Sequence, residues 1–175
     1  MPLEKKAIRL RLGKAPRKLI EKLEELTRAL YGVEFRDYVH ASYFKYVCFD
    51  EICIISAYDP RYTLDIANVT ILYSGMWVAI HVKNVLAPSI PLVKSIYDKT
   101  GVKAAIIVAE KGVKAFLYGN DILAESVVKV IPPHVGLYAV VDSTDGEIVG
   151  FAKWNGTKKV YENVYDLGVF LRALG

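Results

Sequence analysis

The sequence contains few cysteines, the residues that stabilise a fold through disulfide bonds in addition to its hydrophobic core. Only two of its 175 residues are cysteine, Cys48 and Cys53, which excludes a disulfide framework, and we expect two small buried thiols in a reducing compartment. No run of about 18 apolar residues is free of charge, and no apolar stretch of signal-peptide length follows the charged start at Glu4, Lys5 and Lys6. These absences predict a cytoplasmic protein that has no membrane partner.

Residue types that carry catalysis or bind metals are also scarce. The three histidines, His40, His81 and His134, are far apart in the sequence, and no cysteine or acidic residue stands beside them at a metal-ligand spacing. The sequence contains no Gly-x-Ser-x-Gly elbow, His-Glu-x-x-His helix or phosphate-binding loop, and turn chemistry accounts for Asp142 and Asp145. We therefore expect no catalytic residue, no metal and no cofactor, and predict that the protein is not an enzyme.

What the sequence does contain is an unevenly placed positive charge. With 53% hydrophobic and 24% charged residues the composition is that of a folded globular protein, and the formal net charge is +4. Residues 1–18 carry +6, and the remaining chain carries −2. The basic residues of this segment are Lys5, Lys6, Arg9, Arg11, Lys14, Arg17 and Lys18. Most charged strips are only solvated, but a patch this compact can contact phosphates, which makes nucleic acid a candidate partner.

Hydrophobic periodicity predicts the first two elements. Residues 8–12 alternate apolar side chains with Arg9 and Arg11, the pattern of a half-buried strand with a cationic outer face. Residues 16–31 place five apolar side chains on one helical stripe and end before Gly32, at the position of a C-cap glycine. The stripe consists of Leu19, Ile20, Leu23, Leu26 and Leu30. We expect a strand followed by a helix.

Residues 34–82 are rich in aromatic and β-branched side chains, which favours a sheet. Strands are expected at Tyr43–Phe49, Asn68–Tyr73 and Met76–Val82. The last two are joined as a hairpin through Ser74 and Gly75. The stretch Glu51–Tyr58 stays open, because its apolar run suits a strand and is also long enough for two helical turns.

Near residues 95–102 the predicted secondary structure changes from a helix to short, closely spaced strands, which predicts a domain boundary. Pro88 and Pro91 precede a short helix that ends at Gly101, and compact β units follow. These units are strands at Ala104–Val108, Val127–Ile131, Leu137–Val141 and Ile148–Trp154, a helical turn at Val113–Leu117, a hairpin turn at Thr144–Gly146 and a C-terminal helix over Val164, Leu167, Phe170 and Leu171. The predicted fold class is α+β: an N-terminal α/β domain with a mostly antiparallel sheet at residues 1–98, followed by a C-terminal β-barrel at residues 99–175.

Basic and aromatic residues interleave near the C-terminus. Lys153 and Trp154 are followed by Lys158, Lys159 and Tyr161. Single-stranded RNA is commonly held by cations along its backbone and by aromatic rings on which its bases stack. The rings of Trp154 and Tyr161 have an alternative role, since large aromatic side chains often fill the interior of a barrel. Both interpretations stay open at this point.

The order of elements in the second half resembles a PUA domain, the RNA-binding module named for pseudouridine synthases and archaeosine transglycosylases. The segments that carry this likeness are residues 101–108, 112–120 and 142–150. Two strings, Phe116–Asn120 and Asn163–Arg172, are also similar to the nuclear-import-protein-seven family, as are His81-Val82 and Leu86–Pro88. Members of this family are PUA-containing biogenesis factors of the large ribosomal subunit in eukaryotes and archaea. The resemblance is close over about 95 residues and loose over the first 80.

The resemblance implies a PUA-type barrel and a helix at residues 50–58 of the N-terminal domain. It also implies a protein that binds uridine-rich pre-ribosomal RNA without catalysis, during rRNA processing and with ribosome assembly proteins as partners. Family members place basic residues between the last barrel strand and the C-terminal helix, where this chain has Lys158 and Lys159. Glu162 and Tyr165, however, stand where further cations are expected.

The candidate RNA-binding residues lie in three segments. They are Lys153, Lys158, Lys159 and Tyr161 near the C-terminus, Lys114, Tyr118 and Asn120 around the helical turn, and Arg9 and Arg11 as an N-terminal anchor. One alternative function is an RNA-modifying enzyme or its RNA-targeting subunit, related to pseudouridine synthases or transglycosylases, which needs a catalytic Asp or Cys in a pocket. A second alternative is an adaptor whose basic face meets an acidic protein.

Overall fold

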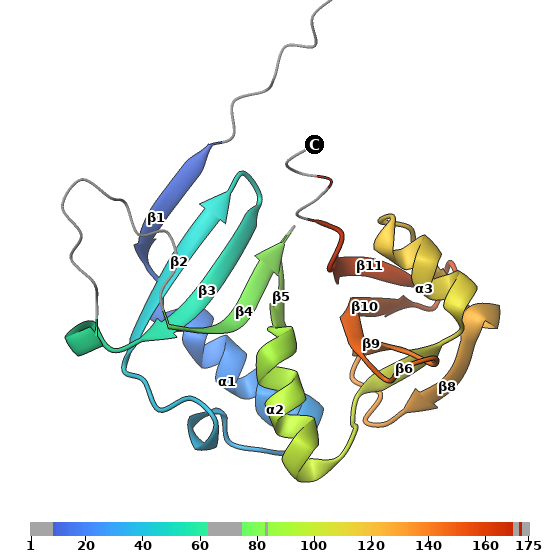
Figure 1. Ribbon diagram of the computed structural model, residues 1–175, viewed down its shortest axis with the longest axis horizontal. Helices are drawn as coiled ribbons and strands as arrows, with labels where there is room; N and C mark the ends of the chain where they lie inside the picture. Colours follow the sequence, from blue (N-terminus) through green and yellow to red (C-terminus); the bar gives the residue numbers. More distant parts are fainter. Residues whose placement is uncertain (1–8, 63–74, 83, 170–171, 173–175) are drawn as a thin grey trace, which may run out of the picture.

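Two β-sheets lie side by side, and helices pack against and between them (Figure 1). The computed structural model describes residues 9–62, 75–82, 84–169 and 172. Helix α1 lies behind the strands of the first sheet in Figure 1, and helix α2 contacts both sheets. This arrangement confirms the predicted α+β class.

Sheet A, the first sheet, is antiparallel throughout and has the strand order β1-β2-β3-β4-β5. Its strands are β1 (Leu10–Lys14), β2 (Tyr43–Phe49), β3 (Ile52–Tyr58), β4 (Met76–Val82) and β5 (Val85–Pro88). The other elements of this region are helix α1 (Arg17–Tyr31), the 3-10 turns η1 (Phe35–Asp37) and η2 (Pro60–Tyr62), and helix α2 (Ile90–Thr100), which leads out of β5.

Sheet B, the second sheet, curls into a half-barrel with the strand order β7-β11-β10-β9-β6-β8. Its strands are β6 (Ala105–Val108), β7 (Ile122–Leu123), β8 (Val127–Ile131), β9 (Leu137–Asp142), β10 (Ile148–Asn155) and β11 (Val160–Asp166). Helix α3 (Glu110–Leu117) follows β6, and the 3-10 turn η3 (Ala124–Ser126) precedes β8. Strands β6 and β9 are parallel, whereas the other neighbours are antiparallel.

Helix α1 forms where the apolar stripe predicts it. Its side chains at Leu23 and Leu30 are fully buried, and the chain leaves the helix at Gly32 in the left-handed region, with φ 69°. The backbone N–H of Gly32 donates to the carbonyl of Arg28 at 2.9 Å, so one of the free carbonyls at the helix end is satisfied. Burial of the stripe, more than helix propensity, holds this element on the sheet.

Helix α2 begins at a buried serine that connects it to sheet A. The Ser89 hydroxyl oxygen accepts a hydrogen bond from the backbone N–H of Leu92 and the hydroxyl donates to the carbonyl of Trp77 at 2.6 Å. Ser89 is therefore both the N-cap of α2 and a cross-link to β4. The helix ends before Gly101, as predicted.

One hydrophobic core extends through both sheets. The cluster of buried side chains that contains Leu23 of α1 and Ile96 of α2 also contains Phe151 of β10 and Tyr165 of β11. Trp77 of β4 meets Tyr165 edge to face, with ring centroids 5.9 Å apart. A smaller cluster under α3 fills the half-barrel. The two sheets are thus fixed relative to each other by shared burial.

The β2–β3 hairpin brings the two cysteines together. Its two-residue loop is Asp50–Glu51, with Asp50 at φ 54°, and the register places Cys48 directly opposite Cys53. The backbone N–H of Asp50 donates to the carbonyl of Arg9, so Asp50 and, by alternation, Cys48 direct their backbone groups toward β1. Cys48 and Cys53 are therefore a non-hydrogen-bonded pair of β2 and β3, the kind in which side chains approach most closely.

The structure joins Cys48 and Cys53 in a disulfide, which corrects the expectation of two buried thiols. The prediction failed because it rested on the number of cysteines and on an expected reducing compartment, and left the C-x4-C spacing of the pair out of account. A two-residue hairpin loop between two strands turns the same spacing into a cross-strand pair.

Two further expectations about secondary structure are wrong. Residues 52–58 form strand β3, as the apolar run favours, and not the helix implied by the family resemblance at residues 50–58. Val164 lies in strand β11, which continues to Asp166 and pairs with β10 and β7, so a C-terminal helix does not begin there. Phe170 and Leu171, also assigned to that helix, lie outside the described residues.

Strand β1 forms as predicted but is not half buried. Leu10 and Leu12 are exposed, because β1 is the edge of sheet A and contacts only β2. The predicted strand Asn68–Tyr73 and the hairpin residue Ser74 lie outside the described residues, whereas Met76–Val82 is strand β4 as expected. Strands β6, β8, β9 and β10 and the Asp145–Gly146 hairpin of sheet B agree with the predictions, whereas β7 and β11 were not predicted, and the predicted helical turn at Val113–Leu117 is part of α3.

We expect Ser89→Ala to lower the free energy of unfolding by about 1.5 kcal/mol, because it removes the N-cap of α2 and leaves the carbonyl of Trp77 without this buried donor. Urea denaturation followed by circular dichroism measures the loss. Ser143→Ala, at an exposed turn, is the control and should change the midpoint little. Equal midpoints for the two variants would show that the cap contributes nothing.

Candidate nucleic-acid interface

The candidate RNA-binding residues occupy three places on the surface. Lys153, Lys158 and Lys159 lie in or beside the β10–β11 hairpin, Lys114, Tyr118 and Asn120 in or just after α3, and Arg9 and Arg11 at the edge of sheet A. Because β11 spans seven residues, the hairpin tip lies roughly 20 Å from the other end of the strand. The structure therefore does not gather these residues into one patch.

At the β10–β11 hairpin, one of the expected cations is already neutralised. Lys158 Nζ lies 3.1 Å from Oε1 of Glu162, and the same oxygen accepts a hydrogen bond from Asn155 Nδ2 at 2.7 Å. The hydrogen bonds from Asn155 and then Lys158 lower the pKa of Glu162, so this carboxylate stays charged at neutral pH. Glu162, which stands where the family resemblance leads one to expect a cation, is the partner that occupies Lys158.

Lys153 and Lys159 are the cations that this hairpin leaves exposed. Neither has an ion pair with a carboxylate in the described part of the chain. Lys159 sits in the left-handed region at φ 54°, in the turn that joins β10 to β11. Lys153 stands opposite Glu162 on the neighbouring strand. The hairpin thus keeps a surplus of positive charge at its surface.

The aromatic residues of the hairpin divide between the core and the surface. Tyr161 is only 7% exposed and belongs to the cluster that fills the half-barrel, which corrects the expectation that its ring offers a face to a base. Trp154 is 37% exposed, with its ring centroid 4.7 Å from that of Tyr161. A row of rings continues from Tyr161 through the buried Tyr138 to His134, which is exposed. Trp154 is therefore the ring available for stacking.

Two of the three candidate residues around α3 also have partners within the molecule. Lys114 Nζ lies 2.6 Å from Oε1 of Glu110, and this hydrogen bond raises the pKa of Lys114. Asn120 donates from Nδ2 to the carbonyl of Ala115 and so closes the end of the helix. Tyr118 is 79% exposed. Of the three candidates here, Tyr118 alone offers a free polar and aromatic surface.

The two strings that resemble the nuclear-import-protein-seven family are joined to each other through Asp166. This carboxylate is 1% exposed and accepts hydrogen bonds from Asn163 Nδ2, the backbone N–H of Gly168 and both terminal nitrogens of Arg172. Asn163 Nδ2 also donates to the carbonyl of Phe116, and Arg172 to that of Leu117. Residues 116–120 and 163–172 thus form one structural unit.

Two glycines leave room for this unit. A Cβ atom at Gly119, which has φ 90°, would lie 3.2 Å from the guanidinium of Arg172. At Gly168 a Cβ atom would lie 2.3 Å from the carbonyl oxygen of Leu117, so the backbone itself would have to shift to accommodate a side chain. The Gly119 and Gly168 positions are therefore required by packing around Arg172.

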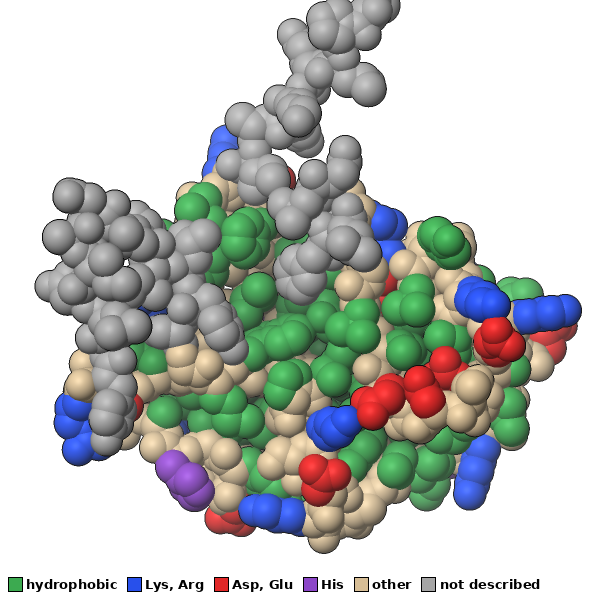
Figure 2. All heavy atoms as spheres, viewed as in Figure 1, with side chains coloured by type: hydrophobic (Ala, Val, Ile, Leu, Met, Phe, Trp, Pro, Cys, Tyr) green, Lys and Arg blue, Asp and Glu red, His purple; other side chains and the backbone are tan. Residues whose placement is uncertain are grey.

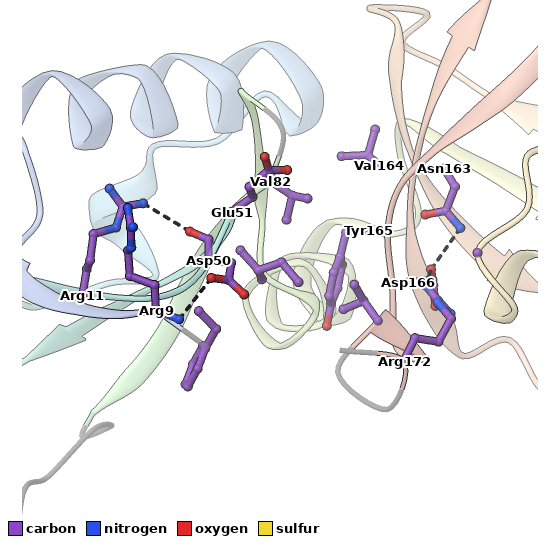
Figure 3. A pocket seen from close by; sticks show the side chains of 14 residues that line it. Arg9, Arg11, Asp50, Glu51, Val82, Asn163, Val164, Tyr165, Asp166 and Arg172 are labelled. Carbon is purple, nitrogen blue, oxygen red and sulfur yellow. Dashed lines mark hydrogen bonds and ion pairs between the residues drawn. The ribbon is translucent and has the colours of Figure 1, made fainter. Parts of the chain in front are cut away.

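A cleft of about 830 Å³ lies between the two sheets. One wall carries Arg9, Arg11 and the hairpin loop Asp50–Glu51 of sheet A, and the other carries the Asp166 unit of sheet B, as Figure 3 shows. The apolar residues of its lining are Phe49, Ile52, Val82, Val164 and Val169. Figure 2 shows that hydrophobic side chains gather in the middle of this face of the molecule, while basic side chains are dispersed around its rim.

Asp50 holds the arginine wall of the cleft in place. The backbone N–H of Arg9 donates to its carboxylate at 3.1 Å, and Nη2 of Arg11 donates to its carbonyl at 3.2 Å. No ion pair of Arg9 or Arg11 with a carboxylate is present in the described residues. Arg172, on the opposite wall, is bound to Asp166. Arg9 and Arg11 thus share their wall with the carboxylates of Asp50 and Glu51, and these four side chains together carry no net charge.

No metal or membrane-spanning feature is found in the described parts of the chain. No three His, Cys, Asp or Glu side chains among residues 9–62, 75–82, 84–169 and 172 are grouped to hold a metal ion. Within the same residues, no helix has the length and apolar character needed to cross a bilayer.

Comparison with known proteins identifies the second half of the chain. A family model described as the UPF0113 PUA domain matches residues 104–175. This stretch is a PUA domain. The finding confirms the PUA part of the resemblance, whereas membership of the nuclear-import-protein-seven family stays a prediction. Comparison with curated proteins finds no match to the chain.

Three solved archaeal structures share the fold over nearly the whole chain. The hypothetical protein PH0734.1 from Pyrococcus horikoshii OT3 is 15% identical, with a TM-score of 0.60 over 90% of this chain and 96% of that one. A conserved PUA domain protein from Thermoplasma acidophilum is 14% identical, with a TM-score of 0.57 over 94% and 100%. A PUA domain, APE0525, from Aeropyrum pernix K1, solved as a tartrate complex, is 16% identical, with a TM-score of 0.60 over 95% and 91%. At these identities the likeness establishes the fold alone.

We expect Asp166→Asn to lower the free energy of unfolding by about 2 kcal/mol, since it weakens a buried ion pair with Arg172 whose other partner is partly exposed to solvent. Urea denaturation gives the size of the loss. The control, Asp98→Asn, changes an exposed carboxylate of α2 and should leave the midpoint nearly unchanged. Comparable effects of both substitutions would contradict the central role of Asp166.

Proposed function

We propose that the protein binds RNA through its PUA domain and does so without changing a covalent bond. The PUA domain at residues 104–175 is the observation that carries this proposal. PUA domains are commonly RNA-binding modules, and the β10–β11 hairpin of this one presents Lys153, Lys158 and Lys159 against Glu162 beside an exposed ring. Binding would combine neutralised phosphates with bases stacked on aromatic rings.

The β10–β11 hairpin is the part of the domain best suited to this contact. Lys153 and Lys159 supply cations that no described carboxylate occupies, and Trp154 supplies a ring face between strand and turn. Tyr118, at the end of α3, offers a second exposed ring. Arg9 and Arg11 supply two further guanidinium groups at the cleft, beside the carboxylates of Asp50 and Glu51 and across from the Asp166 unit. A single strand fits such dispersed contacts better than a rigid duplex does.

The RNA that we infer is pre-ribosomal and uridine-rich, in the assembly of the large ribosomal subunit and in the cytoplasm. Support comes from the resemblance of residues 116–120 and 163–172 to the nuclear-import-protein-seven family, and these two strings are one hydrogen-bonded unit in the fold. Ribosome assembly proteins are the protein partners that this role implies.

Filter binding with a uridine-rich oligonucleotide over a series of salt concentrations tests RNA binding. The affinity of the wild-type protein should fall steeply as salt rises, because each phosphate contact releases counterions. In the variant Lys153→Ala/Lys159→Ala the slope of log affinity against log salt should be smaller by about 1.4, at about 0.7 for each single-strand phosphate contact.

The matched control is Lys111→Ala/Lys129→Ala, which removes two exposed lysines elsewhere on the PUA domain and should leave the slope closer to that of the wild type. If the two double variants have the same slope, the hairpin is not the RNA contact. If the wild-type protein does not bind the oligonucleotide at all, the proposed function is wrong.

Glu162→Gln should strengthen RNA binding. This substitution removes the negative charge that occupies Lys158, so a third cation of the hairpin becomes available, and the salt slope should grow by about 0.7. Glu125→Gln makes the same change in net charge at an exposed site in η3 and is the control. An equal gain in both variants would mean that net charge, and not the release of Lys158, controls affinity.

A further inference from the structure

Two lysines stand directly opposite each other on strands β1 and β2. The register pairs Lys14 with Lys45, and the backbone N–H of the next residue, Ala15, donates to the carbonyl of Phe44. Residues 15 and 44 are therefore a hydrogen-bonded pair, which makes Lys14 and Lys45 a non-hydrogen-bonded pair, the kind in which the Cα atoms of the two residues approach most closely. Like charges directly opposite in a sheet destabilise it.

Among the described residues, no acidic neighbour forms an ion pair that would relieve this repulsion. No carboxylate in the described parts of the chain forms an ion pair with either Lys14 or Lys45. Other basic residues of the same region are paired, for example Arg17 with Glu21 and Arg36 with Glu24. A pair of cations kept together at a cost in stability points to an anionic ligand.

Two tyrosines lie beside the lysine pair. Tyr43 stands opposite Tyr58 on strand β3, with ring centroids 6.0 Å apart. Lys45 Nζ lies 5.5 Å from the centroid of the Tyr58 ring, which fixes this lysine over the ring. Tyr43 is 48% exposed, so its ring has a free surface. Cations and rings therefore meet at one end of sheet A.

The four side chains share the face of sheet A that is turned away from α1. Tyr43 and Lys45 are two residues apart on β2 and so point to the same side. The side chain of Phe44, between them, points the opposite way, into the core formed with α1 and the ring of Phe35. Along the strand Tyr43 and Lys45 are about 7 Å apart, the scale of one nucleotide.

We propose that Lys14, Lys45, Tyr43 and Tyr58 form a second site for single-stranded RNA, in which the two lysines bind a backbone phosphate and a base stacks on Tyr43. This inference rests on the proposed RNA-binding function and adds a contact in the region that precedes the PUA domain. Phosphate between two lysines removes their mutual repulsion, and stacking on a tyrosine tolerates any base. Two sites on one rigid body raise the affinity for a strand long enough to reach both.

The first variant to test is Lys14→Glu, which converts the like-charge pair into an opposite-charge pair. We expect a higher thermal midpoint than in the wild type, because attraction replaces repulsion. We also expect the affinity for a uridine-rich oligonucleotide to fall about tenfold, as one contact of about 1.4 kcal/mol is lost. A purely structural role of Lys14 would not make stability rise while RNA affinity falls.

Tyr43→Ala is the second variant, with an expected loss of affinity of about tenfold. Tyr43→Phe keeps a stacking ring and should retain the wild-type affinity. The control Lys129→Glu makes the charge change of Lys14→Glu on the far edge of sheet B, at β8, and should weaken binding less. Fluorescence anisotropy of a labelled oligonucleotide measures all four affinities on the full chain.

The outcomes separate this inference from the proposed function. If the wild-type protein binds RNA and the hairpin lysines matter, but Lys14→Glu and Tyr43→Ala bind as the wild type does, the second site is wrong and the proposed function stands. If the wild-type protein does not bind RNA, both are wrong. If polyglutamate displaces the oligonucleotide as well as unlabelled RNA does, and Tyr43→Ala changes nothing, the lysine pair serves an acidic protein and the RNA site is overturned.

Discussion

Burial of apolar side chains between the two sheets fixes the position of sheet A relative to sheet B. Ile96 of α2 and Phe151 of β10 are fully buried in the same cluster as Leu23 of α1, and each such side chain contributes about 2–3 kcal/mol. The contact of Trp77 with Tyr165 adds an aromatic link across the sheets. The cleft, the β10–β11 hairpin and the lysine pair therefore keep constant distances from one another, which a flexible linker between two independent domains would not allow.

Pairing decides which cations of this basic protein can meet an anion. Lys114, Lys158 and Arg172 each face a carboxylate, so their charge is already compensated within the molecule. Lys153 and Lys159 of the β10–β11 hairpin have no such ion pair among the described residues. In each of these pairs the two residues are four or six positions apart in the sequence, so the pairing depends on how the local chain folds back in a turn or helix.

Local patterns predicted much of the fold, and tertiary contacts account for what they missed. The stripe of α1 and its Gly32 cap, the hairpin turn at Gly146 and strands β6, β8, β9 and β10 of sheet B follow from periodicity and turn chemistry. Strand β11 was missed because Val164 and Leu167 also suit a helical spacing, and its pairing with β10 overrides that preference. The exposure of Leu10 and Leu12 depends on β1 being an edge strand, which alternation alone does not reveal.

In the candidate site, too, local sequence predicted some features, and tertiary contacts determine the others. The lysines could be recognised from the sequence as candidate cations. The burial of the aromatic rings could not, because Tyr161 and Trp154 are neighbours on one hairpin, yet the Tyr161 ring is buried in the half-barrel and the Trp154 ring lies at its surface. The lysine pair could not be predicted from the sequence, because Lys14 and Lys45 are 31 residues apart and become neighbours only through the register of β1 and β2. Cross-strand neighbours of this kind become visible once the pairing is known.

The position of β6 inside sheet B has a consequence for how the chain is made. Strand β6 lies between β8 and β9 and is parallel to β9, so it cannot complete its ladder until residue 142 has been synthesised. Tyr165, near the end of β11, completes the core beneath Trp77. A growing polypeptide therefore cannot close the core beneath Trp77 until residue 165 has been synthesised.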